Sequence, residues 1–321
     1  MTALLQLRDL RVEFPVRDAV DGGSVLLRAV DGVDLDIGKA DCVGLVGESG
    51  CGKSTLANVL MGLVEPVAGQ VLFDGADVTK HRDPGERRRI QMVFQDPASS
   101  LNPRRRVRSV LAELIQHHDL VPAAGLESAL RGLIDMVGLP YRVLDARPRE
   151  LSGGQRQRVA IARALAVQPE VLVADEAVSA LDVSAQAKVI NLLADLRREL
   201  GLTLVFISHD LGVVRALCDR VVVMYLGRIV EDAPAEELFE APQHPYTTAL
   251  LNAVPDLAPR RRVEGPALEG EPVSALSQIG GCRFRSRCPR AIAECAEQDP
   301  PYVVSGPHRT ACLRVAEAAH R

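Results

Sequence analysis

A glycine-rich segment at residues 47–55 constrains the fold of this chain more than any other feature of its sequence. It reads Gly-Glu-Ser-Gly-Cys-Gly-Lys-Ser-Thr and matches the phosphate-loop pattern G-x-x-x-x-G-K-[ST]. An apolar run at 42–46 precedes it and a helix-like segment at 56–61 follows it, as the strand–loop–helix context of that pattern requires. Backbone N–H groups and the helix N-terminus in such a loop bind a phosphate. We therefore expect a nucleoside triphosphate to bind here.

The loop also predicts the individual contacts. Lys53 is expected to reach the β- and γ-phosphates, and Ser54 is expected to hold Mg²⁺. The predicted ATP contacts of the loop are Gly47, Glu48, Ser49, Gly50, Cys51, Gly52, Lys53, Ser54 and Thr55.

Apolar, β-branched runs alternate with helical segments through the first three-quarters of the chain. A continuous apolar run at 171–174 and mostly apolar runs at 90–94 and 202–207 are typical of buried parallel strands. Residues 3–37 alternate in the manner of a small antiparallel sheet, and residues 107–146 carry helical patterning. The pattern predicts an α/β fold with a mainly parallel central sheet, an antiparallel β subdomain and a helical subdomain.

Polar residues follow three of these predicted strands. Asp175 and Glu176 end one strand, Gln95 follows another, and His209 follows a third. Open α/β sheets place their ligands at the carboxyl ends of strands. Asp175 is therefore a candidate Mg²⁺ ligand through water, and Glu176 is a candidate general base for the attacking water. Gln95 is expected to coordinate Mg²⁺ or the water, and His209 to hydrogen-bond the γ-phosphate.

The order of these elements, together with two further motifs, resembles that of the ATP-binding cassette (ABC) ATPases over roughly residues 4–240. The further motifs are Leu-Ser-Gly-Gly-Gln at 151–155, which is the most specific element, and Ser-Ala-Leu-Asp at 179–182. The resemblance implies a P-loop NTPase cassette that pairs head to tail with a second one. It implies that Ser152, Gly153, Gly154 and Gln155 contact the partner's ATP and that Asp182 lies at the dimer seam.

The resemblance also resolves one ambiguity and shows one departure. Phe14 alone is either a half-buried strand residue or a ring that stacks on adenine, and the resemblance implies stacking. It also implies that Gln95 and the helical insert, about residues 96–150, contact membrane subunits. After Glu176 the family commonly has Pro-Thr, whereas this chain has Ala177 and Val178. The residues with chemical roles are intact, so we expect ATP hydrolysis.

Proline and glycine become frequent from about residue 241, which predicts a boundary between a cassette domain at 1–240 and a small irregular C-terminal domain at 241–321. The segment His-Pro-Tyr at 244–246 and four cysteines further on resemble the extension of oligopeptide and dipeptide importer ATPases. The segment 95–103 resembles the same subfamily. The resemblance implies a second ATPase subunit, the same or paralogous, two transmembrane permeases and an extracytoplasmic solute-binding protein as partners.

The four cysteines are spaced C-x5-C-x6-C-x16-C, and four thiolates suit Zn²⁺ or an iron–sulfur cluster. The candidate ligands are Cys282, Cys288, Cys295 and Cys312. The resemblance favours a [4Fe–4S] cluster, with zinc and four metal-free thiols as the alternatives. Arg283, Arg285, Arg287 and Arg290 are candidates to offset the negative charge of such a centre.

Composition and apolar patterning narrow the classes of partner and the location to be expected for this chain. A net charge of −4 over 321 residues gives no electrostatic indication of nucleic-acid binding. No apolar run approaches the roughly 18 residues of a membrane span, and the N-terminus lacks a signal-peptide pattern. If the protein works at a membrane, it does so through partners, and the resemblance to importer ATPases implies a peripheral protein at the cytoplasmic face of the cell membrane. An ABC ATPase without permeases, an importer of nickel or another small solute, and a binding module that does not hydrolyse ATP remain the alternatives.

Overall fold

The computed structural model describes residues 3–17, 23–253 and 280–319. The chain forms two compact units, of which the first comprises Met1–Ile37, Cys42–Lys80 and His209–Arg321. The second comprises Gly38–Asp41 and His81–Ser208. Residues 254–279, which belong to the C-terminal region foreseen above, lie outside the described residues.

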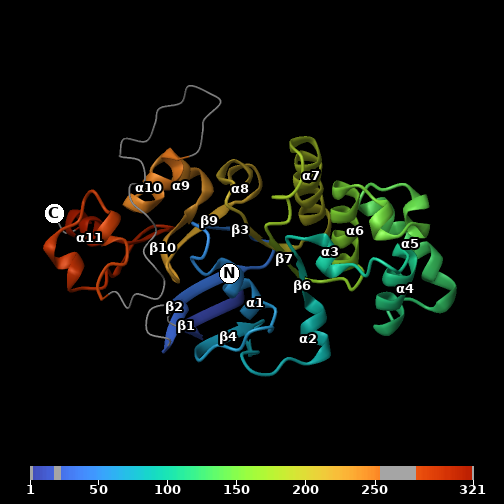
Figure 1. Cartoon of the computed structure of the whole chain (residues 1–321), viewed down its shortest axis with the longest axis horizontal. Helices are drawn as coiled ribbons and strands as arrows, with labels where there is room; N and C mark the ends of the chain where they lie inside the picture. The colour runs from blue at the N-terminus through green and yellow to red at the C-terminus, as the bar shows by residue number, and fades with distance from the viewer. Residues whose placement is uncertain (1–2, 18–22, 254–279, 320–321) are drawn as a thin grey trace. The chain divides into compact units, whose positions relative to one another are not determined.

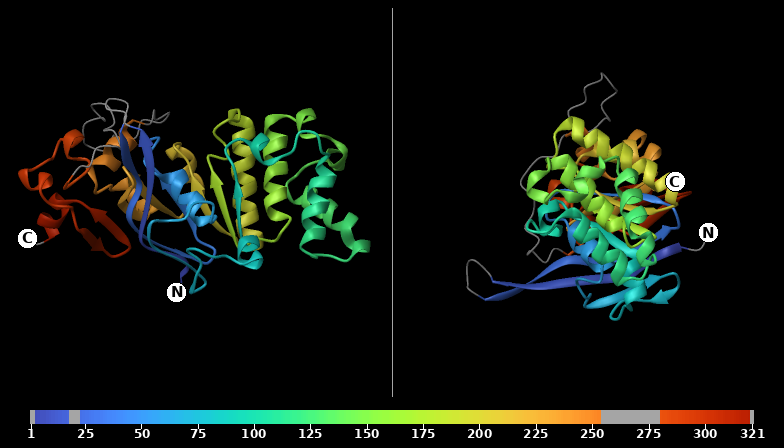
Figure 2. Two further views of the ribbon diagram at one scale, coloured as in Figure 1. Left: turned by 60° about the horizontal axis from the view of Figure 1, so that its bottom comes forward. Right: turned by 90° about the vertical axis from the view of Figure 1, so that its right-hand side faces the viewer.

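The first unit contains a small sheet that confirms the antiparallel arrangement expected from residues 3–37. Its strands are, in order, β2 (Ser24–Gly38), β1 (Ala3–Arg17), β4 (Ala68–Phe73) and β5 (Ala76–Asp77). β1 pairs antiparallel with β4, with Leu5 opposite Phe73. Figure 2 shows β1 and β2 as long strands that run side by side. Leu5, Leu7 and Leu10 are fully buried, which explains why the alternating pattern forms a stable sheet.

The first unit also contains a run of five strands that carries the phosphate loop. Their order is β11 (Tyr302–Ser305), β12 (His308–Ala311), β10 (Arg228–Pro234), β9 (Arg220–Tyr225) and β3 (Cys42–Val46). β3 pairs parallel with β9, and the other pairs in this run are antiparallel. Two strands of the C-terminal region thus extend the sheet that holds the loop, although the sequence periodicity fades there.

The first unit also contains helices and short 3₁₀ turns. They are α1 (Lys53–Leu60), α8 (Leu211–Leu217), α9 (Ala235–Glu240), α10 (Pro245–Asn252) and α11 (Leu313–Ala319), with 3₁₀ turns η4 (Arg285–Arg287) and η5 (Ala293–Ala296). α10 begins at Pro245, whose missing N–H and fixed φ suit the first helical position.

The second unit confirms the predicted parallel strands. β6 (Ile90–Val93) pairs parallel with β7 (Val171–Asp175), which pairs parallel with β8 (Thr203–Ile207). The residues Val171–Ala174 and Thr203–Ile207 are all buried, so the apolar runs reflect strands covered on both faces. The carboxyl ends of the three strands therefore meet at one edge.

The helices of the second unit include the predicted helical insert. They are α2 (Pro84–Arg89), α3 (Pro97–Ser100), α4 (Val107–His117), α5 (Leu126–Met136), α6 (Gly153–Leu165) and α7 (Val183–Leu200), with 3₁₀ turns η1 (Ala123–Gly125), η2 (Tyr141–Asp145) and η3 (Pro148–Glu150). α4, α5 and α6 pack against one another, as Figure 1 shows. The helical patterning of residues 107–146 is thereby confirmed.

α7 differs from the pattern at one end. Val189, Leu193 and Leu196 are buried on one face, as their spacing predicts. Leu200, which the same pattern places on that face, is 46% exposed because the helix ends there and Gly201 turns the chain in a left-handed conformation. Within the described ranges, none of the helices combines the length and the apolar character that crossing a bilayer requires.

Candidate nucleotide-binding site

The phosphate loop follows β3 and leads into α1, as its sequence context predicts. Gly47 has φ +149°, and a Cβ on it would meet the Met224 carbonyl oxygen at 2.2 Å. Gly52, the residue before α1, has φ +108°, and a Cβ there would lie 2.2 Å from the Ala29 carbonyl oxygen. Both positions require glycine because neighbouring backbone occupies the space of a side chain. The loop is therefore held closely against β9 and β2.

Lys53 is the first residue of α1 and is 6% exposed. Its Nζ donates hydrogen bonds to the carbonyl oxygens of Gly47 at 2.8 Å and Glu48 at 2.9 Å. Nζ also lies 3.5 Å from the Cys51 Sγ, and burial raises the pKa of that thiol. The backbone at 47–48 thus holds the ammonium group beside the loop.

The other residues of the first unit that are predicted to contact the nucleotide lie on different helices, strands and loops. Ser54 is exposed in the first turn of α1, and Ser49 and Gly50 are exposed at the top of the loop. Phe14 lies half-buried near the end of β1. His209 is exposed and lies two residues beyond β8 and two residues before α8. An exposed position leaves His209 accessible to a ligand.

The predicted catalytic groups of the second unit meet at the shared edge of its sheet. Asp175 ends β7, and Gln95 lies two residues beyond β6. The Gln95 Nε2 donates a hydrogen bond to the Glu176 Oε2 at 3.0 Å. Glu176 has φ +46°, a backbone conformation that residues other than glycine rarely adopt. Its N–H donates to the Ile207 carbonyl at 2.9 Å. Backbone strain of this kind gathers at functional sites.

The departure at 177–178 leaves this geometry in place. Ala177 and Val178 are each 2% exposed and belong to the core, while Glu176 keeps its hydrogen bond from Gln95. The Ser179 Oγ donates to the Glu176 carbonyl oxygen at 3.0 Å and stabilises the turn that follows β7.

The signature segment forms the start of α6 through a capping box. The Ser152 Oγ accepts a hydrogen bond from the Gln155 N–H at 3.3 Å, and the Gln155 Oε1 accepts one from the Ser152 N–H at 3.0 Å. Asp182 caps α7 in the same manner by accepting the Ala185 N–H at 2.9 Å. The Gly154 Cα faces Ala185, since a Cβ at Gly154 would lie 3.1 Å from the Cβ of Ala185. The start of α6 is therefore close to the start of α7.

These two helix starts line one hollow of about 290 Å³ in the second unit. The lining includes the predicted residues Ser152, Gly153, Gly154 and Asp182. It also includes Arg158 and Lys188, which the sequence reasoning missed. Arg158 lies four residues after Gly154 on α6, so helical spacing from the signature is the signal that finds it. The N-termini of α6 and α7 and the cations Arg158 and Lys188 outweigh the carboxylate of Asp182, so the hollow suits an anion.

The structure corrects the assignment of two arginines that were expected to offset a metal centre. Arg283 forms an ion pair with Asp31 on β2 and donates to the Leu226 carbonyl. Arg287 pairs with Glu48 of the phosphate loop. Each is paired with a carboxylate outside the cysteine segment, because the segment lies against the first unit's sheet.

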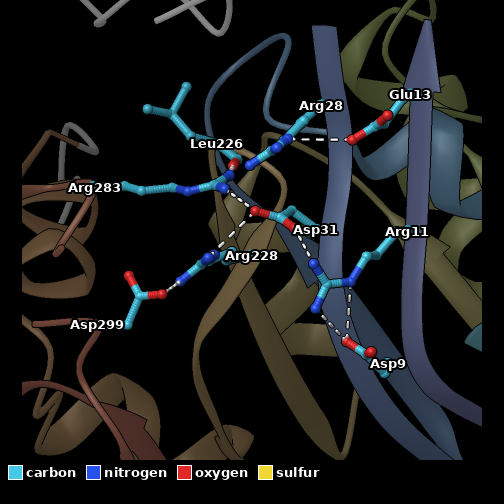
Figure 3. A network of polar contacts seen from close by, with 9 residues as sticks. All are labelled: Asp9, Arg11, Glu13, Arg28, Asp31, Leu226, Arg228, Arg283 and Asp299. Atoms are coloured by element: carbon cyan, nitrogen blue, oxygen red, sulfur yellow. Dashed lines mark hydrogen bonds and ion pairs between the residues drawn. The ribbon is translucent and has the colours of Figure 1, made fainter. Parts of the chain in front are cut away.

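Figure 3 shows the network around Asp31. Asp31 is 4% exposed, and Arg228 and Arg11 pair with it at 3.2 and 3.5 Å in addition to Arg283. Burial by itself raises the pKa of Asp31, but the three arginines together lower it below its usual value. Arg228 also pairs with Asp299 of the C-terminal region at 2.9 Å. These pairs attach the C-terminal region to β2 and β10.

The four C-terminal cysteines are all free thiols. The Cys282 N–H donates to the Cys295 carbonyl at 2.9 Å. Burial, with the other three thiols nearby, raises the pKa of Cys282 to about 11, and burial raises the pKa of Cys288 as well. Across the part of the chain that the structure describes, no three His, Cys, Asp or Glu side chains form a group that could hold a metal ion. The thiols are neighbours, but they do not form an assembled metal site.

Solved structures with this fold are ATP-binding cassettes. The ATP-binding cassette MJ0796, solved as a dimer in a post-hydrolysis state bound to ADP and Pi, is 30% identical and has a TM-score of 0.63, covering 72% of this chain and 98% of that one. cbiO1 from Clostridium perfringens, part of the cbiONQ ABC transporter complex, is 28% identical with a TM-score of 0.64, covering 75% of this chain and 92% of that one. The fold and the loop therefore define a P-loop ATPase of the cassette class.

Relatives with known names narrow this class. The family model "ABC transporter" matches residues 30–179, and the model "Oligopeptide/dipeptide transporter, C-terminal region" matches residues 230–295. A putative peptide import ATP-binding protein of Brucella ovis is 46% identical over 98% of both chains. The dipeptide transport ATP-binding protein DppF of Escherichia coli is 44% identical, covering 97% of this chain and 94% of that protein.

The chain belongs to the ATP-binding subunits of ABC transporters, in the branch of the oligopeptide and dipeptide importers. It is an ATP-hydrolysing enzyme of that class, for which ATP and Mg²⁺ are the expected nucleotide and metal. The P-loop fold, the antiparallel and helical subdomains and the resemblance at 151–155 are thereby confirmed.

Proposed function

We propose that this chain hydrolyses ATP in a head-to-tail pair of cassettes and thereby energises the import of di- and oligopeptides. The observation that carries the proposal is the division of the chemistry between two surfaces. The phosphate loop with Lys53 belongs to one unit, whereas the signature lines a hollow of the other unit. A hollow of about 290 Å³ suits a phosphate group better than a whole nucleotide. A γ-phosphate presented by a second cassette is the anion that fits it.

Each predicted residue then has a role in the reaction. Loop N–H groups and Lys53 bind the β- and γ-phosphates, and Phe14 stacks on the adenine. Ser54, Asp175 and Gln95 suit Mg²⁺ because hydroxyl, carboxylate and amide oxygens are its preferred protein ligands, and the ion would neutralise phosphate charge. Glu176 accepts a proton from the attacking water, Gln95 orients the carboxylate, and His209 donates a hydrogen bond to the γ-phosphate.

The partner cassette completes the site. Ser152, Gly153 and Gly154 would present N–H groups to the partner's γ-phosphate, and Gln155 would hold Ser152 through the capping box. Asp182, exposed at the start of α7, would lie at the seam. A lone chain is therefore expected to bind ATP and hydrolyse it slowly. Hydrolysis that rises with the square of protein concentration, or on assembly with a second subunit, tests this.

Another hollow, in the second unit of the chain, is the proposed docking site for a permease. It measures about 400 Å³, and its lining includes Gln95, Leu101, Pro103 and Pro148. Gln157 also lines it, is 1% exposed, and has an Nε2 without a hydrogen-bond partner among the described residues. A buried donor of this kind suits a carbonyl oxygen of a docked segment. Because Gln95 lines the hollow and bonds Glu176, docking would couple to the catalytic carboxylate.

The peptide cargo is proposed from the relatives' names, which refer to peptide, oligopeptide and dipeptide transport. The expected partners are a second ATPase subunit, two transmembrane permeases and an extracytoplasmic solute-binding protein, with the chain peripheral at the cytoplasmic face of the membrane. Affinity purification from membranes, followed by uptake of labelled dipeptide and of Ni²⁺, tests this. Peptide-stimulated ATP hydrolysis supports the proposal. Recovery without permeases, or uptake of nickel alone, contradicts the peptide assignment.

The cysteine segment is proposed as a [4Fe–4S] site, with zinc as the alternative. Support comes from the four neighbouring thiols, although they are not assembled into a metal site in the structure. Burial raises the pKa of Cys282 and of Cys288, so a bound cation would offset the cost of ionising these two thiols. Protein purified without oxygen is expected to absorb in the visible range and to contain iron. Stoichiometric zinc without colour selects the alternative, and the absence of both metals refutes a metal site.

A further inference from the structure

The C-terminal region contacts the phosphate loop at Glu48. The Glu48 N–H donates to the Tyr246 Oη at 2.8 Å, across 198 positions of sequence. The Glu48 carboxylate accepts two hydrogen bonds from Arg287, at 2.7 and 3.0 Å, across 239 positions. All three residues belong to the first unit. Backbone and side chain of Glu48 are therefore both held from outside the loop.

The ion pair with Arg287 is sheltered from solvent. The Arg287 side chain is 5% exposed and that of Glu48 is 24% exposed. The hydrogen bond to Glu48 raises the pKa of Arg287 above its usual value. A bidentate arginine–carboxylate pair fixes orientation as well as distance. Glu48 is thus held in one position rather than merely attracted.

An aromatic cluster fixes the groups that hold Glu48. Tyr246 of α10 lies 4.6 Å from Tyr225 of β9, measured between ring centroids. Phe284, the residue before η4, lies 5.3 Å from Tyr225 and 5.4 Å from Tyr246. All three rings are buried. The Arg287 N–H donates to the Phe284 carbonyl at 3.0 Å, so the packing of Phe284 anchors the turn that carries Arg287.

Glu48, held in this way, accepts a hydrogen bond from Lys53, the lysine proposed to bind phosphate. The carbonyl oxygens of Gly47 and Glu48 accept the hydrogen bonds of the Lys53 Nζ. A displacement of Glu48 therefore displaces two groups that place the ammonium. The phosphate-loop pattern leaves position 48 unspecified, so the pattern itself does not require a glutamate there.

We propose that Arg287 and Tyr246 are positioning residues for ATP binding: they fix Glu48, which in turn places Lys53 and the loop for the nucleotide phosphates. The C-terminal region then sets the affinity of the loop for ATP as well as covering the sheet. This inference rests on the proposed role of the loop and Lys53 in binding the phosphates.

The test measures ATP and ADP binding to the full chain in Mg²⁺ by isothermal titration calorimetry. Arg287→Met is expected to weaken ATP binding about tenfold. This is near the lower end of the usual coupling between two sites in a protein, because the Glu48 side chain is a quarter exposed. Arg287→Lys keeps the charge and is expected to recover part of the loss. Tyr246→Phe keeps the ring cluster, removes the acceptor of the Glu48 N–H, and is expected to weaken binding about threefold.

Arg285→Met is the matched control. Arg285 lies in the same 3₁₀ turn, and its side chain donates to the carbonyls of Gly280 and Ala296 of its own segment. Arg285→Met removes the same charge as Arg287→Met without changing a contact to the phosphate loop. ATP binding is therefore expected to stay within about twofold of the wild type. A double-mutant cycle adds Glu48→Gln, after which Arg287→Met is expected to have little further effect.

The outcomes separate the inference from the proposed function. Lys53→Ala is expected to abolish binding; if it binds ATP like the wild type, the role of the loop itself is refuted. If Lys53→Ala does not bind ATP but Arg287→Met binds it as tightly as Arg285→Met does, the positioning role is refuted. The positioning role is also refuted if the losses of ATP affinity in Arg287→Met and Glu48→Gln add fully in the double variant. Thermal unfolding without nucleotide accompanies each variant. If Arg287→Met loses affinity only because the chain unfolds, Arg287→Lys and Tyr246→Phe, at unchanged stability, bind normally and overturn the inference.

Discussion

His244 provides a prediction that the structure makes quantitative. It is 2% exposed and caps α10: its Nδ1 accepts the Tyr246 N–H at 3.1 Å, while its own backbone N–H donates to the Glu231 carboxylate at 3.1 Å. A protonated Nδ1 cannot accept a hydrogen bond, so the cap requires the neutral ring. Burial lowers the pKa of His244 to about 4, although the nearby Glu231 opposes the shift. Protonation should therefore destabilise the segment that carries Tyr246.

The sign and size follow from linkage. The unfolded state has a histidine pKa of about 6.5 and binds the proton more readily than the folded state between about pH 6.5 and pH 4. The contribution to stability is therefore complete above about pH 6.5 and is lost as the pH falls toward 4. Between pH 7.5 and pH 5, a pKa of about 4 corresponds to a loss of about 2 kcal/mol.

His244→Asn tests this with little change in structure. Asparagine keeps an acceptor at the helix cap and does not titrate. Urea unfolding followed by circular dichroism at pH 7.5, 6 and 5 compares the two proteins. Glu231 and His308, which pair at 2.7 Å, are present in both proteins, so the difference between them reports the titration of His244 together with its interaction with Glu231. The wild type should lose about 2 kcal/mol more than the variant over this range. Parallel losses would refute the assignment of the pH dependence to His244.

Three further substitutions test the site. Glu176→Gln keeps a group that can bond Gln95 but removes the base, so ATP hydrolysis by the assembled complex should fall about 10²- to 10⁴-fold while ATP binding persists; equal rates contradict the base assignment. Gly47→Ala places a Cβ 2.2 Å from the Met224 carbonyl and should lower stability by about 1–3 kcal/mol and weaken ATP binding, which thermal unfolding and calorimetry measure; an unchanged melting temperature contradicts the strain. Gly154→Asp adds a carboxylate to the signature hollow, so hydrolysis by the pair should fall at least about tenfold with normal ATP binding to the isolated chain. Loss of that binding would show that the hollow serves the chain's own nucleotide.

Local pattern was sufficient for the elements and for much of the chemistry. The loop at 47–55, the parallel strands and the capping box at 152–155 are encoded by residues close together in sequence, and the structure contains all of them. The end of α7 shows what such a pattern leaves open, because periodicity identifies a helix face but not where the core beneath it stops. Leu200 lies beyond that point.

The sequence alone determined that this chain carries a phosphate loop, a signature segment and a carboxylate at a strand end, because each is a short motif with its own hydrogen-bonding logic. Only the tertiary structure decided which distant residues support them. No periodicity indicates that Arg287 pairs with Glu48 or that Tyr246 accepts its N–H, since both partners lie about 200 positions or more away. Pairing of β12 with β10, and burial of the aromatic rings, bring the C-terminal region to the loop. Contacts of that kind depend on the packing of the whole unit, and packing is what a linear pattern leaves open.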